Sequence, residues 1–309
     1  MAQFGIHHVT AISGEARRNL AFYSGTLGLR LVKKTVNFDD PGAYHLYYGD
    51  AAGSPGTIMT FFPWANAAAG RQGVGELQET VFRVPQAAIG FWTHRLMAAG
   101  VADFERAERF GEPVLSFRDP DGLRLALLAL PGLEAEPGWA TTEIPAEHAL
   151  RGFHSVSLML EDSAATGAIL SDVLGFAEVA KEGNTTRFQA PGTVIGGIVD
   201  LRAVGGFLPG RQGRGSVHHL AFRADDDAAE AEMVRKLAEH HGIATTEQKD
   251  RNYFRSVYFR EPGHVLFEIA TDIPGFAVDE PAESLGQALK LPDFLETRRA
   301  EIERRLPQL

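Results

Sequence analysis

Gly5-Ile6-His7-His8-Val9, near the start of the chain, reappears in altered form as Gly152-Phe153-His154-Ser155-Val156. The two stretches lie 147 residues apart, and the same shift aligns Ser24, Leu27 and Gly28 with Ser171, Leu174 and Gly175. Chance similarity does not keep one spacing over separated positions, so the chain contains a duplicated segment. Repeats of this kind indicate a fold built from copies of one structural unit.

The duplication extends through both halves of the chain. Gly70-Arg71-Gln72-Gly73 recurs 140 residues later as Gly210-Arg211-Gln212-Gly213, and Phe117-Arg118-Asp119-Pro120 recurs 142 residues later as Phe259-Arg260-Glu261-Pro262. The small differences in shift indicate loops that have changed in length. Each half also divides again, because a short alternating segment opens at each of four glycines: Gly5, Gly75, Gly152 and Gly215. The chain therefore contains four quarter-length modules.

Each module is predicted to consist of one strand, one helix and three further strands. The helices are amphipathic stretches that end at a glycine, which suits the left-handed position after a helix; they cover residues 16–27, 87–99, 164–174 and 228–241. The later strands are short runs separated by turn residues, such as 43–48, 57–62, 114–117, 123–129, 255–260 and 265–270. The predicted fold class is α+β, with four βαβββ modules in two tandem halves.

Prolines divide the halves, and the repeat stops before the chain ends. Pro131, Pro137 and Pro145 punctuate the connection, which places a boundary near residues 131–150. We predict an N-terminal half over residues 1–140, a C-terminal half over 141–272 and a tail over 273–309. The tail is expected to form a helix over residues 291–306, with Pro292 in its first turn, and to pack against the body.

Composition limits the classes of function. The chain has 309 residues, 44% of them hydrophobic and 23% charged, which excludes a disordered or fibrous protein. Its net charge of −10 argues against binding to nucleic acid or to a membrane surface, so its partners are expected to be small molecules. Cysteine is absent, which leaves His, Asp and Glu as metal ligands.

The sequence also carries an expectation about location. No apolar run is long enough to span a membrane, and the first residues lack the features of a signal peptide. We therefore expect a cytoplasmic protein. A monomer and a homo-oligomer are both open.

The modules resemble those of the vicinal oxygen chelate superfamily, which includes glyoxalase I and the extradiol dioxygenases. The resemblance covers residues 5–272. A closer similarity to the hydroquinone ring-cleaving dioxygenases rests on four segments: Gly5-Ile6-His7-His8-Val9-Thr10, Val217-His218-His219, Asp250-Arg251-Asn252-Tyr253-Phe254-Arg255-Ser256 and Phe267-Glu268-Ile269. It implies mixed β-sheet half-barrels flanked by helices, and a site for Fe(II), or sometimes Mn(II), formed by His8, His219 and Glu268.

The repeat alignment tests this metal triad independently. His8 opens the first module, His219 opens the fourth, and Glu268 lies on the last strand of the fourth, so the three converge if these two modules share a barrel. The aligned positions of the second and third modules hold other residues: Glu79, Ser155 and Ala126. Thr60 stands approximately where a fourth ligand would be, which leaves coordination positions open. Two histidines and one carboxylate with open positions suit non-haem Fe(II).

Strand geometry separates the members of each histidine pair. Neighbouring side chains on a strand point to opposite faces, so only one histidine of each pair can bind the metal directly. The resemblance assigns that role to His8 and His219, with Thr10 on the face of His8. It leaves His7 and His218 for contacts behind the ligands or with the substrate. A structural role at the edge of the core is the alternative for these two histidines.

Arg251 and Tyr258 match residues that the family places around the substrate. A guanidinium would hold a phenolate or a developing carboxylate, and a phenol could donate a hydrogen bond to reacting oxygen. The alternatives are a surface arginine and a tyrosine that faces the core. The remaining histidines, His45 among them, are given ordinary structural roles.

The resemblance implies an extradiol-type ring-cleaving dioxygenase that opens an aromatic diol, a substituted hydroquinone, with O2. Its para hydroxyls cannot both bind one metal, so one would bind the metal and the other would meet the protein. His218, Arg251 and Tyr258 are the candidates for proton transfer and charge stabilisation, with His7 and Thr10 beside them. Two alternatives are a glyoxalase-type metal-dependent isomerase and a non-catalytic small-molecule binding protein of the same fold.

Overall fold

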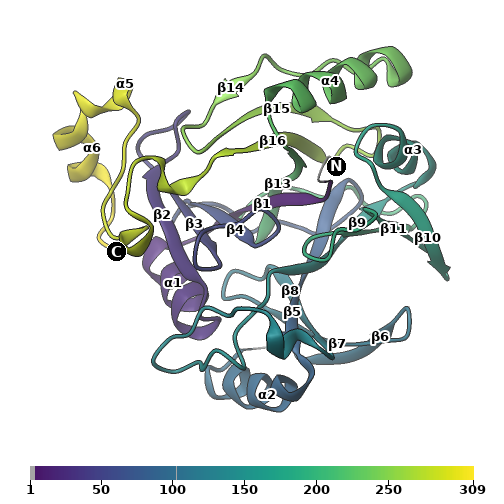
Figure 1. Ribbon diagram of the computed structural model, residues 1–309, viewed down its shortest axis with the longest axis horizontal. Coiled ribbons are helices and arrows are strands. Elements are labelled where there is room, and N and C mark those ends of the chain that lie inside the picture. Colours follow the sequence, from purple (N-terminus) through teal and green to yellow (C-terminus); the bar gives the residue numbers. More distant parts are fainter. Residues whose placement is uncertain (1–3, 102) are drawn as a thin grey trace.

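The computed structural model describes residues 4–101 and 103–309. The strands form two curled eight-stranded sheets with the helices around them (Figure 1). The first sheet contains β1 Ile6–Ser13, β2 Arg30–Val36, β3 Tyr44–Gly49, β4 Ile58–Pro63, β13 Ser216–Ala224, β14 Lys249–Asp250, β15 Phe254–Arg260 and β16 Leu266–Pro274. The second contains β5 Glu76–Pro85, β6 Glu105–Arg109, β7 Glu112–Arg118, β8 Arg124–Leu130, β9 Phe153–Leu160, β10 Ala177–Glu182, β11 Thr185–Gln189 and β12 Ile198–Ala203.

The sheets pair modules across the two halves of the chain. The first sheet has the order β14-β15-β16-β13-β1-β4-β3-β2, so it joins the fourth module to the first, and the second sheet joins the third to the second. Within a module the first strand runs parallel to the last, as β1 does to β4 and β13 to β16. Modules meet through their opening strands, which run antiparallel, as β1 and β13 do. The predicted βαβββ architecture is confirmed.

The four predicted module helices are present. They are α1 Ala16–Leu20, which continues as a π-helix over Ala21–Thr26, α2 Ile89–Ala98, α3 Ala164–Asp172 and α4 Asp227–His241. The helix α4 begins at Asp226, whose carboxylate accepts hydrogen bonds from the amides of Ala228 and Ala229. It ends at Gly242 with φ at 64°, the left-handed conformation that its sequence predicts.

The tail differs from the prediction. In place of one helix over residues 291–306 it forms two short helices, α5 Asp293–Glu296 and α6 Arg299–Arg305. The break follows Thr297, a β-branched residue of low helix propensity, and the amide of Arg298 turns back to the carbonyl of Leu295 in a tight three-residue turn. The expected packing against the body is confirmed, since Leu291, Leu295, Ile302 and Leu306 are buried in the main core.

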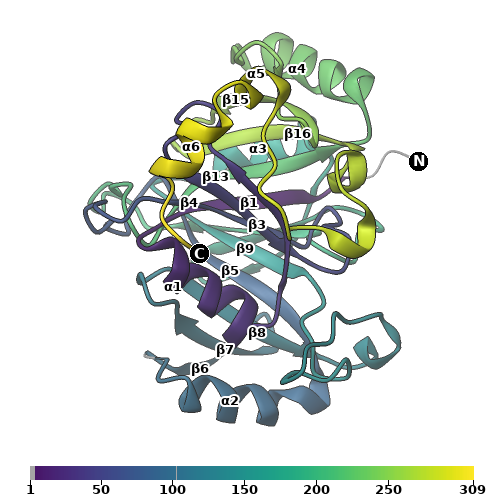
Figure 2. The same cartoon turned by 90° about the vertical axis from the view of Figure 1, so that its left-hand side faces the viewer.

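A buried lysine fastens the tail to the first sheet. Lys33 on β2 is fully buried, and its ammonium lies 2.5 Å from the carboxylate of Asp279 and also contacts Glu280. A buried cation is stable only when it is paired, so these two carboxylates fix the tail segment to β2. Figure 2 shows the tail, in yellow, on the side of the molecule that faces the viewer. Asp279 in turn accepts a hydrogen bond from Tyr253, which braces the segment that carries Arg251.

No helix in residues 4–101 and 103–309 is long and apolar enough to cross a membrane.

Glu76, at the start of β5, gives the fold a testable pH dependence. Its side chain is buried, its Oε1 has no hydrogen-bond partner, and burial raises its pKa to about 7, although the Gly73 amide and Arg71 lower it. Between about pH 4 and pH 7 the folded state therefore holds a proton that the unfolded state has lost, so stability falls as pH rises. We expect Glu76→Gln to be more stable than the wild type by about 1–2 kcal/mol at pH 8, after a discount for solvent screening.

Urea unfolding of both proteins at pH 5 and pH 8 measures this difference. Glu147→Gln, the same change at an exposed position, serves as the surface control. A Glu76→Gln difference that is the same at both pH values would contradict the assignment.

Candidate metal centre

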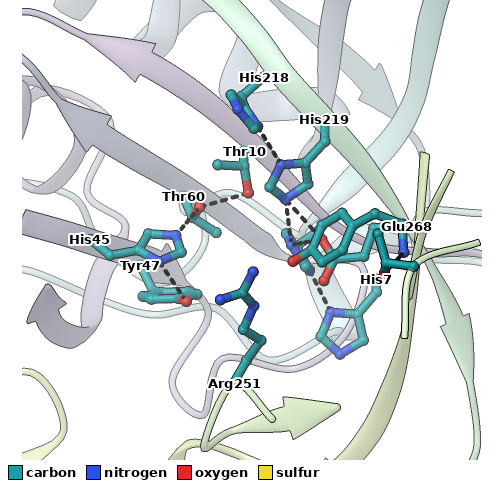
Figure 3. A network of polar contacts seen from close by, with 12 residues as sticks. His7, Thr10, His45, Tyr47, Thr60, His218, His219, Arg251 and Glu268 are labelled. Atoms are coloured by element: carbon teal, nitrogen blue, oxygen red, sulfur yellow. Dashed lines mark hydrogen bonds and ion pairs between the residues drawn. The ribbon is translucent and has the colours of Figure 1, made fainter. Parts of the chain in front are cut away.

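Three side chains from adjacent strands of the first sheet converge on one point. His8 lies on β1, His219 on β13 and Glu268 on β16, and all three are buried. Glu268 Oε2 lies 2.8 Å from His219 Nε2 and 3.2 Å from His8 Nε2, and the two Nε2 atoms are 3.3 Å apart. One atom of each residue falls within 4.8 Å of the other two. Figure 3 shows His219 and Glu268 facing one another in this cluster.

The chemistry of this cluster suits a divalent cation. Glu268 is completely buried, and neither of its carboxylate oxygens makes a well-formed hydrogen bond. Burial alone would raise the pKa of Glu268, but the neighbouring His8 and His219 lower it well below its usual range, so the group is a carboxylate. A buried carboxylate without hydrogen bonds is costly unless a cation neutralises it. Two imidazoles and one carboxylate are the donor set of non-haem Fe(II) sites.

Each histidine of the triad is held by the histidine that precedes it. His7 Nδ1 lies 2.9 Å from His8 Nδ1, and His218 Nδ1 lies 2.8 Å from His219 Nδ1. These contacts engage the ring nitrogens that do not face Glu268, which fixes the orientation of both rings. The register between β1 and β13 shifts twice, between Ile6 and His8 on β1 and between Val217 and His219 on β13. The irregular backbone at each histidine pair allows neighbouring rings to touch, where a regular strand would point them to opposite faces. His7 is a buried residue and does not lie on the surface.

A cavity of about 190 Å³ opens beside the triad. Its lining joins the two histidines of the triad to a set of aromatic and polar side chains: Asn37, Phe38, Asp39, His45, Tyr47, Phe62, Trp64, His218, Arg251, Phe254 and Tyr258. The structure thus brings three of the predicted substrate residues to the cavity, namely His218, Arg251 and Tyr258. Among the described residues that line it, His7 and Thr10 do not appear. Thr10 Oγ1 instead lies 2.9 Å from Thr60 Oγ1.

Arg251 brings a positive charge to the wall of this cavity. The Arg251 guanidinium lies 5.5 Å from the ring centre of Tyr258 and 3.2 Å from the Asp39 carboxylate. Burial acts to lower the pKa of Arg251, but Tyr258 and Asp39 outweigh it and the pKa is raised, so the group stays cationic. Burial and the charge of Glu268 raise the pKa of Tyr258, so its phenol keeps its proton. Burial lowers the pKa of His218 to about 3, which leaves that imidazole neutral.

His45 and Tyr47 are cavity residues that the sequence analysis missed. Both lie on β3, the third strand of the first module, at alternate positions that face the same side. The third strand of the fourth module is β15, which carries Tyr258. The module repeat could therefore have revealed them, because equivalent strands of paired modules line one barrel.

The second sheet contains a counterpart cavity without a metal cluster. It has a volume of about 230 Å³ and is lined in part by Glu79, Ser155, Arg109 and Arg124. Glu79 stands where His219 stands in the first sheet, but an ion pair with Arg109 and a 3.0 Å hydrogen bond from Ser116 satisfy its carboxylate. The Arg109 guanidinium thus neutralises Glu79, as a metal ion would neutralise Glu268 in the first sheet. In the part of the chain that the structure describes, His8, His219 and Glu268 form the one cluster of metal-binding side chains.

We therefore expect one metal ion per chain. Elemental analysis after dialysis of metal-loaded protein measures the ratio, and Glu79→Gln should retain the full amount because its carboxylate already has a protein partner. A ratio of two metals per chain, or loss of metal in Glu79→Gln, would refute the single-site assignment.

Known proteins have sequences and a fold that are similar to those of this chain. The sequence model of the Glyoxalase/Bleomycin resistance protein/Dioxygenase superfamily matches residues 5–127. The chain is 46% identical over 302 residues to the "Putative ring-cleaving dioxygenase MhqO" of Bacillus subtilis strain 168, covering 98% of this chain and 95% of that protein. It is 33% identical over 305 residues to the chlorohydroquinone/hydroquinone 1,2-dioxygenase of Sphingobium indicum, covering 96% and 94%. A Bacillus subtilis crystal structure, 45% identical, superposes with a TM-score of 0.94 over 99% of this chain and 97% of its own.

Proposed function

The chain belongs to the glyoxalase, bleomycin resistance protein and dioxygenase superfamily, and on that basis we propose that it is a metal-dependent dioxygenase that opens the ring of an aromatic diol with O2. The observation that carries the proposal is the buried Glu268 carboxylate, which needs a cation to neutralise it. It lies between His8 and His219 at the edge of a cavity lined by aromatic side chains. Membership alone does not fix the chemistry, because members of one fold catalyse different reactions.

The proposed metal is Fe(II), with Mn(II) as the second choice. His8, His219 and Glu268 would hold it through two imidazole nitrogens and one carboxylate oxygen, on one side of the ion. A bound Fe(II) ion would supply open coordination positions and the one-electron chemistry by which O2 attacks an aromatic ring. His7 and His218 would keep the two ligand imidazoles in orientation through their Nδ1 contacts.

The proposed substrate is a hydroquinone with ring substituents. The cavity volume of about 190 Å³ fits one ring, since a cavity of about 150 Å³ already binds benzene. Phe62, Trp64 and Phe254 provide flat apolar walls for it. The two para hydroxyls of a hydroquinone point in opposite directions, so one would face the triad and the other the far wall.

Three polar residues of the cavity have distinct proposed roles. His218 lines the cavity next to His219, and this position makes it the proposed acceptor for the proton of the hydroxyl that faces the triad. Arg251 is a fixed positive charge and would stabilise negative charge as it develops on the oxygen atoms. Tyr258 keeps its proton and would donate a hydrogen bond to the same region.

Two other functions fit the fold less well. A glyoxalase-type isomerase needs the metal but has no use for O2, and a non-catalytic binding protein has no use for the buried triad. The relative named chlorohydroquinone/hydroquinone 1,2-dioxygenase is 33% identical across nearly the whole chain, which supports the dioxygenase.

An oxygen electrode tests the proposed function. The protein would be loaded with Fe(II) without oxygen and then supplied with hydroquinones or catechols in aerated buffer. We expect O2 uptake coupled to loss of the aromatic absorbance, faster with hydroquinones. Isomerisation of a thiohemiacetal without O2 uptake would point to the glyoxalase alternative, and binding without turnover of either kind to a binding protein.

A further inference from the structure

A chain of hydrogen bonds runs through the far wall of the cavity and takes no part in the roles described above. Tyr47 Oη lies 2.8 Å from His45 Nδ1, His45 Nε2 lies 2.8 Å from Thr60 Oγ1, and Thr60 Oγ1 lies 2.9 Å from Thr10 Oγ1. Figure 3 shows the four side chains in this order, with His45 and Tyr47 on the opposite side of the view from Glu268. Of the four, His45 and Tyr47 line the cavity.

Rigid neighbours hold the two cavity residues in place. The His45 ring centre lies 4.0 Å from that of Tyr47 and 4.3 Å from that of Phe62, and Phe62 in turn contacts the ring of His218. Tyr47 is almost fully buried and packs against Phe276 of the tail. The wall therefore extends without interruption from beside the triad to the phenol oxygen of Tyr47.

The number of protons on Tyr47 and His45 determines which atom can form a hydrogen bond with a ligand. Burial raises the pKa of Tyr47 and lowers that of His45, so both groups are neutral. A neutral imidazole has one N–H and one acceptor nitrogen, and both nitrogens of His45 already have partners. If Tyr47 donates to His45, its oxygen keeps a free acceptor site. If His45 donates to Tyr47, the phenol O–H is free to donate. Tyr47 Oη thus has unused hydrogen-bonding capacity at the cavity in either arrangement.

A hydroxyl group is the complement of this oxygen, because a hydroxyl both donates and accepts. A methyl group at the same place would leave the remaining hydrogen-bonding site of the buried Tyr47 oxygen unpaired, and an unpaired buried polar site discriminates strongly between ligands. We propose that Tyr47 binds the second hydroxyl of the aromatic substrate, that His45 positions Tyr47, and that this pair makes the site select diols over phenols with one hydroxyl. This inference rests on the proposed function, and it names the feature that sets substrate class.

Anaerobic calorimetry on the Fe(II)-loaded protein tests the inference without turnover. The two probes are hydroquinone and para-cresol, which has a methyl group in place of the second hydroxyl. In the wild type we expect hydroquinone to bind more tightly. Tyr47→Phe should weaken hydroquinone binding by about 10- to 100-fold and leave the affinity for para-cresol unchanged or higher. Tyr44→Phe is the matched control, because Tyr44 lies on the same strand and donates to the Pro307 carbonyl, away from the cavity.

His45 variants test the positioning role. His45→Leu removes the imidazole and its hydrogen bonds to Tyr47 and Thr60, and should reduce the preference for hydroquinone. His45→Asn offers a polar group near the position of Nδ1 and should restore part of that preference. A steric effect would change the affinities for both probes together.

The outcomes separate this inference from the proposed function. If the wild type binds hydroquinone preferentially and both Tyr47→Phe and His45→Leu keep that preference, the inference is wrong and the proposed function stands. If the Fe(II)-loaded wild type binds neither phenol, the proposed function fails and the inference falls with it. Loss of preference in Tyr47→Phe together with full preference in Tyr44→Phe supports the inference.

Discussion

The variant His219→Ala is expected to lose both tight metal binding and ring cleavage. His219 contributes one of three donor atoms, and its Nε2 is the nearest neighbour of the Glu268 carboxylate at 2.8 Å. Two remaining donors cannot hold a metal through dialysis at the open site proposed here. Because bound metal contributes several kcal/mol to catalysis of this kind, we expect O2 uptake to fall by about 10³-fold or more.

The matched control for this variant is His240→Ala. His240 is exposed near the end of α4 and lies outside the cluster, so its metal content and activity should equal those of the wild type. Chelation of the wild type should lower its melting temperature, because a ligand of the native state stabilises that state. Chelation should not affect the metal-free His219→Ala protein. Full metal retention in His219→Ala would reject the assigned triad.

The second large effect is expected for Arg251→Met, which should keep its metal. Arg251 contacts Tyr258 and Asp39 and makes no contact with the triad, so its proposed partner is substrate charge. If the guanidinium stabilises charge that grows during ring opening, kcat should fall by about 10²- to 10³-fold. If it holds the substrate equally in the ground and transition states, KM should rise while kcat stays constant.

Steady-state kinetics on metal-loaded Arg251→Met decide between these two roles. Arg255→Met is the matched control, since Arg255 follows Arg251 closely in the chain, at the start of β15, and pairs with Asp227 outside the cavity. Unchanged kcat and KM in Arg251→Met would remove Arg251 from the active site and leave it an ordinary surface arginine.

The architecture could be predicted from sequence because it is repeated. The matching positions at Gly5 and Gly152, and at Gly75 and Gly215, mark four equivalent opening strands, and each strand is followed by a helix with a glycine shortly after its end. Repetition supplies several independent copies of each local signal. The tail has no second copy, and there the prediction of one continuous helix is wrong: the chain breaks after Thr297 into α5 and α6.

The metal triad could be proposed from sequence, whereas the hydrogen bonds within the far wall of the cavity could not. The family resemblance implies His8, His219 and Glu268, and the repeat places the two histidines on opening strands and Glu268 on a last strand. The pairing of the first and fourth modules in one sheet then brings them together. The role of His45 depends on side-chain contacts with Tyr47 and Thr60, which sequence does not reveal. The same holds for the neutralisation of Glu79 by Arg109.

Isotope labelling tests the central claim most directly. The Fe(II)-loaded protein would be supplied with a hydroquinone under isotopically labelled O2. The product would be reduced at once, because an aldehyde oxygen exchanges with water, and then analysed by mass spectrometry. The account predicts a ring-opened product that carries both labelled oxygen atoms, formed by the wild type and absent with His219→Ala. A product that carries one label or none, or equal product from His219→Ala, would contradict a dioxygenase built on His8, His219 and Glu268.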